Sequence, residues 1–155
     1  MALRKPGHFA TLLRVRKRQE NRQSAMLGHV RKVIAHAQED RQAIAHQQQA
    51  ALDKAGQLAR KRFDAADVRR FYQYERYLAR RADEKDAEIQ KLTQEEAQER
   101  AKLEDAMKHR RMAEHLEDHV ANTYAGHVRK FEQQQSDEVA SNYHTRGIPR
   151  AGGGG

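Results

Sequence analysis

The nine histidines are the first residues of this chain whose type suggests chemistry, because imidazole is a common metal ligand. His115 and His119 are four residues apart, which on a helix places both rings on one face, as in helical zinc sites. The zinc-protease pattern needs a glutamate directly after the first histidine, and Leu116 stands there instead. Beyond the neighbouring Glu114 no third ligand is evident. The sequence therefore predicts no metal site.

Paired carboxylates such as Glu95-Glu96 and Glu117-Asp118 are the candidates for acid–base chemistry. Such pairs need a cleft that excludes water and shifts a pKa, and a chain of this composition offers none. The glycines at 152–155 follow no strand and open no helix, so they do not form a phosphate loop. Cysteine is absent, which excludes disulfides and thiolate metal sites. We predict a protein with no catalytic residues and no cofactor.

A basic run, Arg14-Val15-Arg16-Lys17-Arg18, lies near the N-terminus, with Arg22 beyond it. Residues 1–63 hold 14 Lys or Arg against 4 Asp or Glu, whereas residues 64–155 hold 16 against 18. Such a run binds nucleic-acid phosphates or an acidic protein, or is merely a solvated face. A basic zipper would need an uninterrupted seam after Leu27, which is missing. An acidic protein partner therefore fits better than nucleic acid.

The composition restricts the elements that position these residues. Leu, Ile, Val and Phe total only 25 of 155 residues, and the net charge is +8, which permits either disorder or long helices. Helical periodicity persists over many turns, and the only prolines are Pro6 and Pro149. No apolar run is long enough for a membrane span, and no secretory signal is recognisable. We therefore expect long helices.

A narrow apolar stripe in the second half of the chain predicts how those helices pack. Within residues 65–92 its members are Val68, Phe71, Leu78, Ala82, Ile89 and Leu92. A stripe this thin is the seam of a coiled coil. Asp64 reads as an N-cap, with Asp67 in the first turn. The predicted fold class is all-α: an antiparallel two-helix coiled coil, or long α-hairpin, whose second helix is longer and overhangs the first.

The predicted boundaries are a flexible lead at 1–7, a helix at about 8–61, a turn at about 62–64, a helix at about 65–141 and a disordered tail at 142–155. The first seam comprises Phe9, Leu13, Arg16, Glu20, Gln23, Leu27, Val30, Ile34, Ala37, Arg41, Ile44, Gln48, Ala51, Ala55 and Leu58. The second continues through Leu103, Ala106, Ala113, Leu116 and Val120. A turn near 63–64 sets Phe9 opposite Asp118 and Val30 opposite Ala97. Around Glu96 and Glu99 we expect loose packing.

Two stretches present surface to a partner. The overhang carries Tyr124, Val128, Phe131 and Val139 with no mate in the chain, which makes it a candidate docking surface. At the start of the second helix, Phe71, Tyr74 and Leu78 follow seam spacing, whereas Tyr72 and Tyr77 fall off that line and face outward.

The chain resembles the flagellar export protein FliJ family from about residue 8 to residue 146. The resemblance lies in Phe9…Leu12-Leu13…Arg16, in Tyr74-Glu75-Arg76-Tyr77-Leu78 with Ile89 and Leu92, in Leu103-Glu104-Asp105-Ala106…Arg110-Arg111…Glu114-His115-Leu116, and in Glu132-Gln133-Gln134…Asp137-Glu138-Val139-Ala140. The weak seam near Glu96–Glu99, the many histidines and the glycine tail depart from the family pattern.

The resemblance implies a non-enzymatic stalk at the centre of the hexameric flagellar export ATPase, which promotes ring assembly and links the ring to the export-gate membrane protein; some members escort export chaperones. It implies a cytoplasmic monomer, bound peripherally to the cell membrane through partners only, with no nucleic acid and no cofactor. The implied ring contacts are Phe9, Leu13, Arg14, Arg16, Lys17, Arg18, Arg22, Val120, Tyr124, Val128 and Phe131. The implied gate contacts are Tyr74, Tyr77 and Leu78, with Arg41, Gln48 and Leu52 added by position.

Three alternatives stay open at this point. The first is the equivalent stalk of a virulence-type secretion system. The second is a basic coiled coil that binds nucleic acid, and the third is a structural spacer that dimerises through its overhang.

Overall fold

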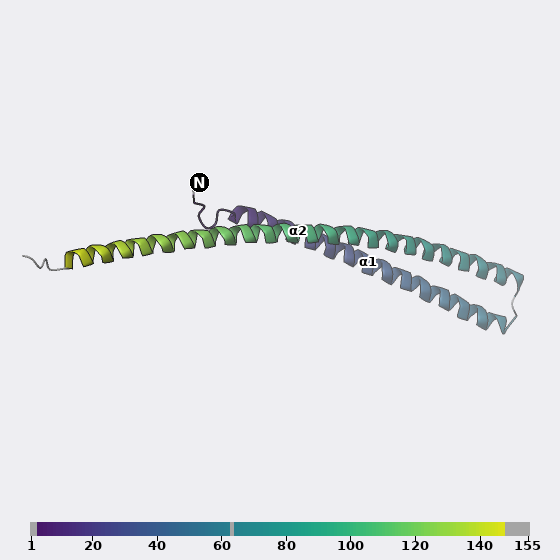
Figure 1. Ribbon diagram of the computed structural model, residues 1–155. Coiled ribbons are helices and arrows are strands. Elements are labelled where there is room, and N and C mark those ends of the chain that lie inside the picture. Colours follow the sequence, from purple (N-terminus) through teal and green to yellow (C-terminus); the bar gives the residue numbers. More distant parts are fainter. Residues whose placement is uncertain (1–2, 63, 148–155) are drawn as a thin grey trace, which may run out of the picture. The chain divides into compact units, whose positions relative to one another are not determined.

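The computed structural model describes residues 3–62 and 64–147. Over this part of the chain the only elements are two helices, α1 (Ala10–Ala59) and α2 (Ala65–Gly147). They pack against each other in antiparallel fashion and α2 is the longer, which confirms the predicted fold class (Figure 1). Residues 148–155, where most of the predicted tail falls, lie outside the described residues.

The described residues form two compact units. Residues 19–107, which contain the connection between the helices, are called the hairpin unit below. Residues 3–18 together with 108–147 are called the terminal unit.

The start of α2 follows from its local sequence. The carboxylate of Asp64 accepts a hydrogen bond from the backbone N–H of Ala66 at 2.8 Å, and Asp67 lies in the first turn. This side-chain acceptor satisfies one of the N–H groups that the first turn of a helix leaves without a partner. The predicted N-cap at Asp64 is thereby confirmed.

The hairpin unit is held by one narrow apolar seam. Its buried members are Leu27, Ile34, Ala37, Ile44, Leu78 and Ala82. All of them belong to the predicted seam, so the helical spacing identified the packed faces correctly. Large side chains are scarce here, and Ile44 and Leu78 are the two largest that are fully buried.

Polar contacts cross this seam where apolar residues are missing. Arg31 pairs with Glu96 at 3.3 Å and Arg41 with Asp86 at 2.8 Å, both at the predicted register. Gln23 donates to the carboxylate of Glu99, although the predicted register placed it opposite Glu104. The expected weak point around Glu96 and Glu99 therefore contains specific hydrogen bonds between the helices.

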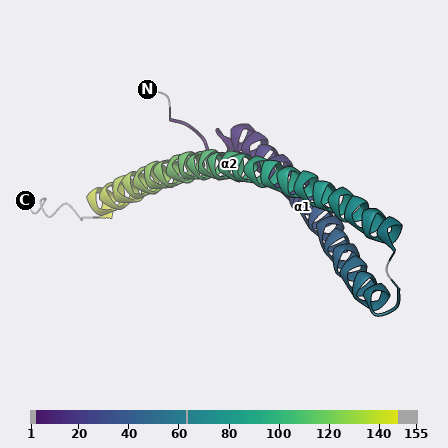
Figure 2. The same ribbon diagram turned by 90° about the vertical axis from the view of Figure 1, so that its right-hand side faces the viewer.

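Toward the connection between them, α1 and α2 separate (Figure 2). Small residues, Ala51 and Ala55, occupy the α1 side of the seam here, and both are only half-buried. Leu58 and Tyr74, which we predicted to lie in the seam, are 38% and 44% exposed. The prediction was wrong for these two because alanines are too short to close the space between the helices.

In the terminal unit, Ala113 and Val120 are buried, whereas the predicted seam residue Leu116 is 42% exposed. Glu117 takes the inward position instead. Its carboxylate accepts hydrogen bonds from the backbone N–H groups of Gly7 and Phe9, the latter at 2.9 Å. No acidic residue lies in the first turn of α1, so this carboxylate from α2 supplies the negative charge that a helix N-terminus favours.

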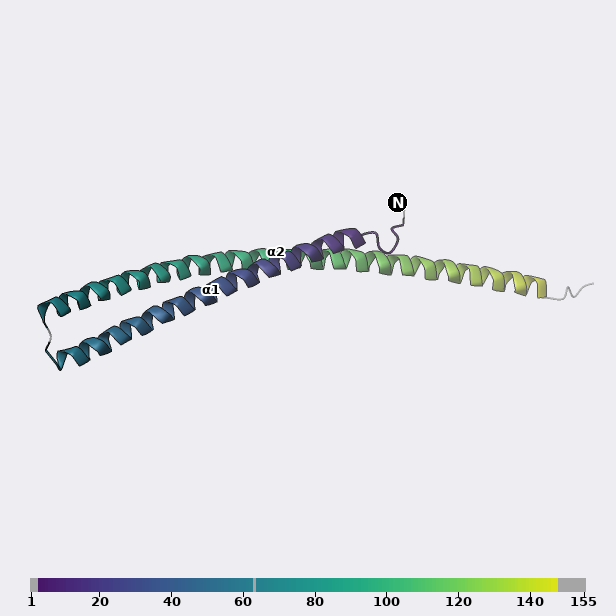
Figure 3. The same ribbon diagram turned by 180° about the vertical axis from the view of Figure 1, so that it is seen from behind.

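The C-terminal part of α2 extends beyond the residues that pack against α1 in this unit (Figure 3). Every residue from 129 to 147 is exposed. The helix continues to Gly147, past the predicted end at about residue 141. Within the described residues, no helix combines the length and apolar character needed to cross a membrane.

We expect Leu78→Ala to lower the free energy of unfolding by about 2 to 4 kcal/mol, because it removes a fully buried side chain and leaves a cavity. Thermal unfolding followed by circular dichroism measures the effect. Met112→Ala, at a position 62% exposed, is the matched control and should change stability by less than about 0.5 kcal/mol. Equal losses in the two variants would contradict the assigned seam.

A second expectation concerns the stability that Glu99 contributes at acidic pH. Hydrogen bonds from Lys102 and Gln23 stabilise the charged carboxylate of Glu99 and lower its pKa. A lowered folded-state pKa contributes stability that is present above the unfolded-state value and is lost as the pH falls through the folded-state value. The melting-temperature difference between wild type and Glu99→Gln should therefore shrink between about pH 6 and about pH 3. A difference independent of pH would count against this contact.

Candidate functional site

The start of α2 presents an exposed aromatic cluster. Tyr72, Tyr74 and Tyr77 are each about half exposed. The rings of Tyr74 and Tyr77 stack with centroids 6.4 Å apart, and the Arg81 guanidinium lies 5.8 Å from the centre of the Tyr77 ring. Ring stacking restricts the side chains before any partner arrives, which makes them suitable anchors for protein contacts.

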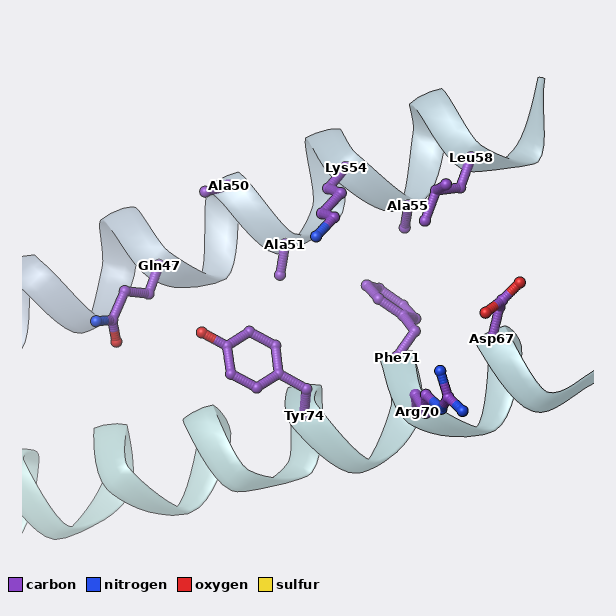
Figure 4. A pocket seen from close by; sticks show the side chains of 10 residues that line it. All are labelled: Gln47, Ala50, Ala51, Lys54, Ala55, Leu58, Asp67, Arg70, Phe71 and Tyr74. Atoms are coloured by element: carbon purple, nitrogen blue, oxygen red, sulfur yellow. The ribbon is translucent and has the colours of Figure 1, made fainter. Parts of the chain in front are cut away.

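An open groove of about 510 Å³ lies between the helices beside this cluster (Figure 4). Phe71 and Tyr74 project from α2 toward Ala51 and Ala55 of α1. The complete lining is Gln47, Ala50, Ala51, Lys54, Ala55, Leu58, Asp67, Arg70, Phe71 and Tyr74. Ala51, Ala55 and Phe71 make much of the lining apolar, while Lys54 and Arg70 add positive charge and Asp67 negative charge.

The predicted gate residues lie in three different settings. Gln48, Leu52 and Leu78 line a second, smaller groove of about 290 Å³, together with Phe71. Leu52 is 52% exposed, whereas Leu78 is only 1% exposed and belongs to the seam. Arg41 lines neither groove and forms an ion pair with Asp86. The structure thus brings Gln48, Leu52 and Leu78 together and separates Arg41 from them.

The basic run lies in the terminal unit, apart from Arg22. Arg14, Lys17 and Arg18 are exposed, and Arg16 is half-buried. Leu13 is half-buried on the same turns. These residues form an exposed positive surface, whereas Arg22 lies exposed in the hairpin unit.

On α2, the predicted ring residues range from buried to exposed. Val120 is 6% exposed and belongs to the packed seam. Tyr124 and Val128 are half-buried and line a shallow groove with Leu3 and Phe131. Phe131 itself is 60% exposed. Phe9, the remaining ring candidate, is half-buried beneath the Arg4 guanidinium, 5.5 Å from its ring centre.

Sequence reasoning missed two features of these surfaces. One is Glu117, whose carboxylate holds the start of α1. It and the predicted Leu116 fit the spacing between Ala113 and Val120 equally well, so spacing gave no signal to distinguish them. Tyr143 is 81% exposed and shares a shallow groove with Val139 on α2. Its position four residues after Val139 was the available signal.

His115 and His119 are both exposed. Across residues 3–62 and 64–147, no three His, Asp or Glu side chains are grouped so as to hold a metal ion.

The family model of the flagellar FliJ protein matches residues 5–147. Comparisons with curated proteins and with solved structures find no match. The family model covers most of the chain, so the chain belongs to the flagellar FliJ family.

Proposed function

We propose that this protein, a component of the flagellar export apparatus, is the non-enzymatic stalk of the export ATPase. On this proposal it occupies the centre of the hexameric ring, promotes ring assembly and connects the ring to the export gate. The observation that carries the proposal is the family match over residues 5–147. The two-helix hairpin supports it, because a stalk must reach two partners along its length. The protein acts in the cytoplasm and reaches the membrane through its partners.

The ring side of the proposal rests on the terminal unit. Arg14, Lys17 and Arg18 are exposed, and none of them has a carboxylate partner among the residues that the structure describes. Positive charge of this kind suits acidic loops lining the ring and speeds association. Elsewhere in the same unit, the exposed Phe131 of α2 supplies an apolar contact.

The gate side rests on the hairpin unit. Tyr74 lines the larger groove and Leu52 the smaller one, and the exposed Tyr77 stacks on Tyr74. Tyrosine beside an apolar groove is a common arrangement at binding hot spots. The buried Leu78 supports the walls of this site, and the exposed tyrosines make the contact with the gate protein.

The stalk acts by differential contact. A helical hairpin has different side chains on each face, so at any moment it touches each of six ring subunits differently. Contacts that differ in free energy between subunit states shift the populations of those states. No side chain of the stalk needs to react for this effect.

For the ring contact, we expect Arg14→Glu, Lys17→Glu and Arg18→Glu in one variant to reduce stimulation of the purified export ATPase at least tenfold at physiological salt. The variant replaces attraction with repulsion at the proposed interface. ATP hydrolysis measured over a range of stalk concentrations gives the effect.

The control carries the same charge change elsewhere: Lys32→Glu, Lys91→Glu and Arg100→Glu, all at exposed positions of the hairpin unit. It should stimulate within about twofold of wild type. Absence of stimulation by the wild-type protein at any ratio would refute the stalk proposal, and equal loss in both variants would refute the ring contact.

For the gate contact, we expect the double variant Tyr74→Ala with Tyr77→Ala to bind the cytoplasmic domain of the gate protein at least tenfold more weakly. Truncating a hot-spot tyrosine costs roughly 2 kcal/mol or more of binding free energy. Calorimetric titration measures it. Tyr143→Ala, on an exposed tyrosine of the terminal unit, is the control and should bind as wild type does. Unchanged binding in the double variant would place the gate contact elsewhere.

A further inference from the structure

A row of arginines covers the outer face of the first turns of α2. Arg69, Arg76 and Arg80 are separated by seven and four residues, so they lie in line along one side of the helix. All three are exposed, whereas Leu78 and Ala82 on the other side are buried against α1. The row therefore faces away from the seam and from both grooves.

Tyrosines and further arginines flank this row. Tyr72 lies on one flank, and Tyr77 with Arg81 lies on the other. We call Arg69, Tyr72, Arg76, Tyr77, Arg80 and Arg81 the Arg–Tyr face. Glu75, the sole acidic residue between 69 and 81, lines the smaller groove on the α1 side.

The arginines of the Arg–Tyr face form no ion pair within the described residues, although Asp83 and Glu84 lie three and four residues beyond Arg80. No carboxylate there pairs with Arg69, Arg76, Arg80 or Arg81. The connection just before α2 adds more exposed cations at 60–62. Like charges this close repel one another and oppose folding. An external anion would remove that repulsion.

The side chains indicate which anion. Every cation between residues 69 and 81 is arginine, whose planar guanidinium binds phosphate oxygens with two hydrogen bonds. Phenol rings placed among arginines are typical of surfaces at the membrane–water interface. Clusters of four to eight basic residues on a helix bind anionic lipids.

We propose that the Arg–Tyr face binds the phosphate headgroups of anionic phospholipids directly. The arginines contact the lipid phosphates, and Tyr72 and Tyr77 lie at the level of the headgroups. Duplex nucleic acid fits less well, because its stacked bases would offer nothing for these rings to stack on. The inference goes beyond the stalk proposal, in which partners provide the membrane association. It shares Tyr77 with the proposed gate contact, whereas the row of Arg69, Arg76 and Arg80 belongs to the lipid proposal alone.

The test is flotation of the full-length protein with vesicles of phosphatidylcholine containing about one third phosphatidylglycerol. We expect binding to these vesicles, little binding to pure phosphatidylcholine, and weakening as salt rises. The variant Arg69→Gln, Arg76→Gln and Arg80→Gln should bind roughly a hundredfold more weakly, since each basic residue near the surface contributes about 1 kcal/mol. Tyr72→Ala with Tyr77→Ala should also weaken binding.

The control variant, Lys32→Gln, Lys91→Gln and Arg100→Gln, loses the same charge at other exposed positions of the hairpin unit and should bind within about threefold of wild type. Circular dichroism checks that each variant keeps its helicity. Equal loss in the two charge variants, or equal binding to neutral vesicles, would overturn the proposal. If single-stranded DNA binds more tightly than the vesicles at the same salt, and the arginine variant loses that binding, the Arg–Tyr face is assigned to nucleic acid instead.

Discussion

The scarcity of apolar side chains is the constraint on which this structure depends. Each helix buries a single narrow stripe, and only a few large residues such as Ile44 and Leu78 are fully covered. Such a stripe stabilises the pairing of two helices but cannot enclose a cavity that would exclude water from a reacting group. Most side chains therefore remain at the surface, where they are available to partners.

Polar contacts across the seam determine which of several similar pairings forms. An apolar stripe repeats along each helix, so a shift by a few residues would cost little hydrophobic burial. The Arg41–Asp86 ion pair and the hydrogen bond from Gln23 to Glu99 each form in one alignment only. Polar residues in such seams specify register at some expense of stability. That alignment decides which α1 residues, Leu52 among them, lie beside the tyrosines of α2.

Spacing alone predicted the two helices, the N-cap at Asp64 and the buried seam of the hairpin unit, because period and capping are local properties of the chain. It failed where the outcome depends on the opposite helix. Leu116 and Glu117 both fit the spacing between Ala113 and Val120, and the apolar Leu116 was predicted for the seam. The carboxylate of Glu117 is nevertheless held inward by N–H groups of α1. Ala51 and Ala55 are too small to cover Tyr74, which becomes evident only when the two helices are placed side by side. The grooves were invisible in the sequence for the same reason.

Charge then distinguishes the surfaces that the seam leaves exposed. Where acidic and basic residues alternate, as at Lys85 between Asp40 and Glu88, ion pairs form within the molecule and the pKa of the lysine is raised. The Arg–Tyr face has no such carboxylates, although acidic residues are frequent further along the same helix. Internal pairing was available to this chain and is used in the middle of the hairpin unit. Its absence at the start of α2 leaves those arginines free for phosphate, and the neighbouring tyrosines make a lipid surface the better fit.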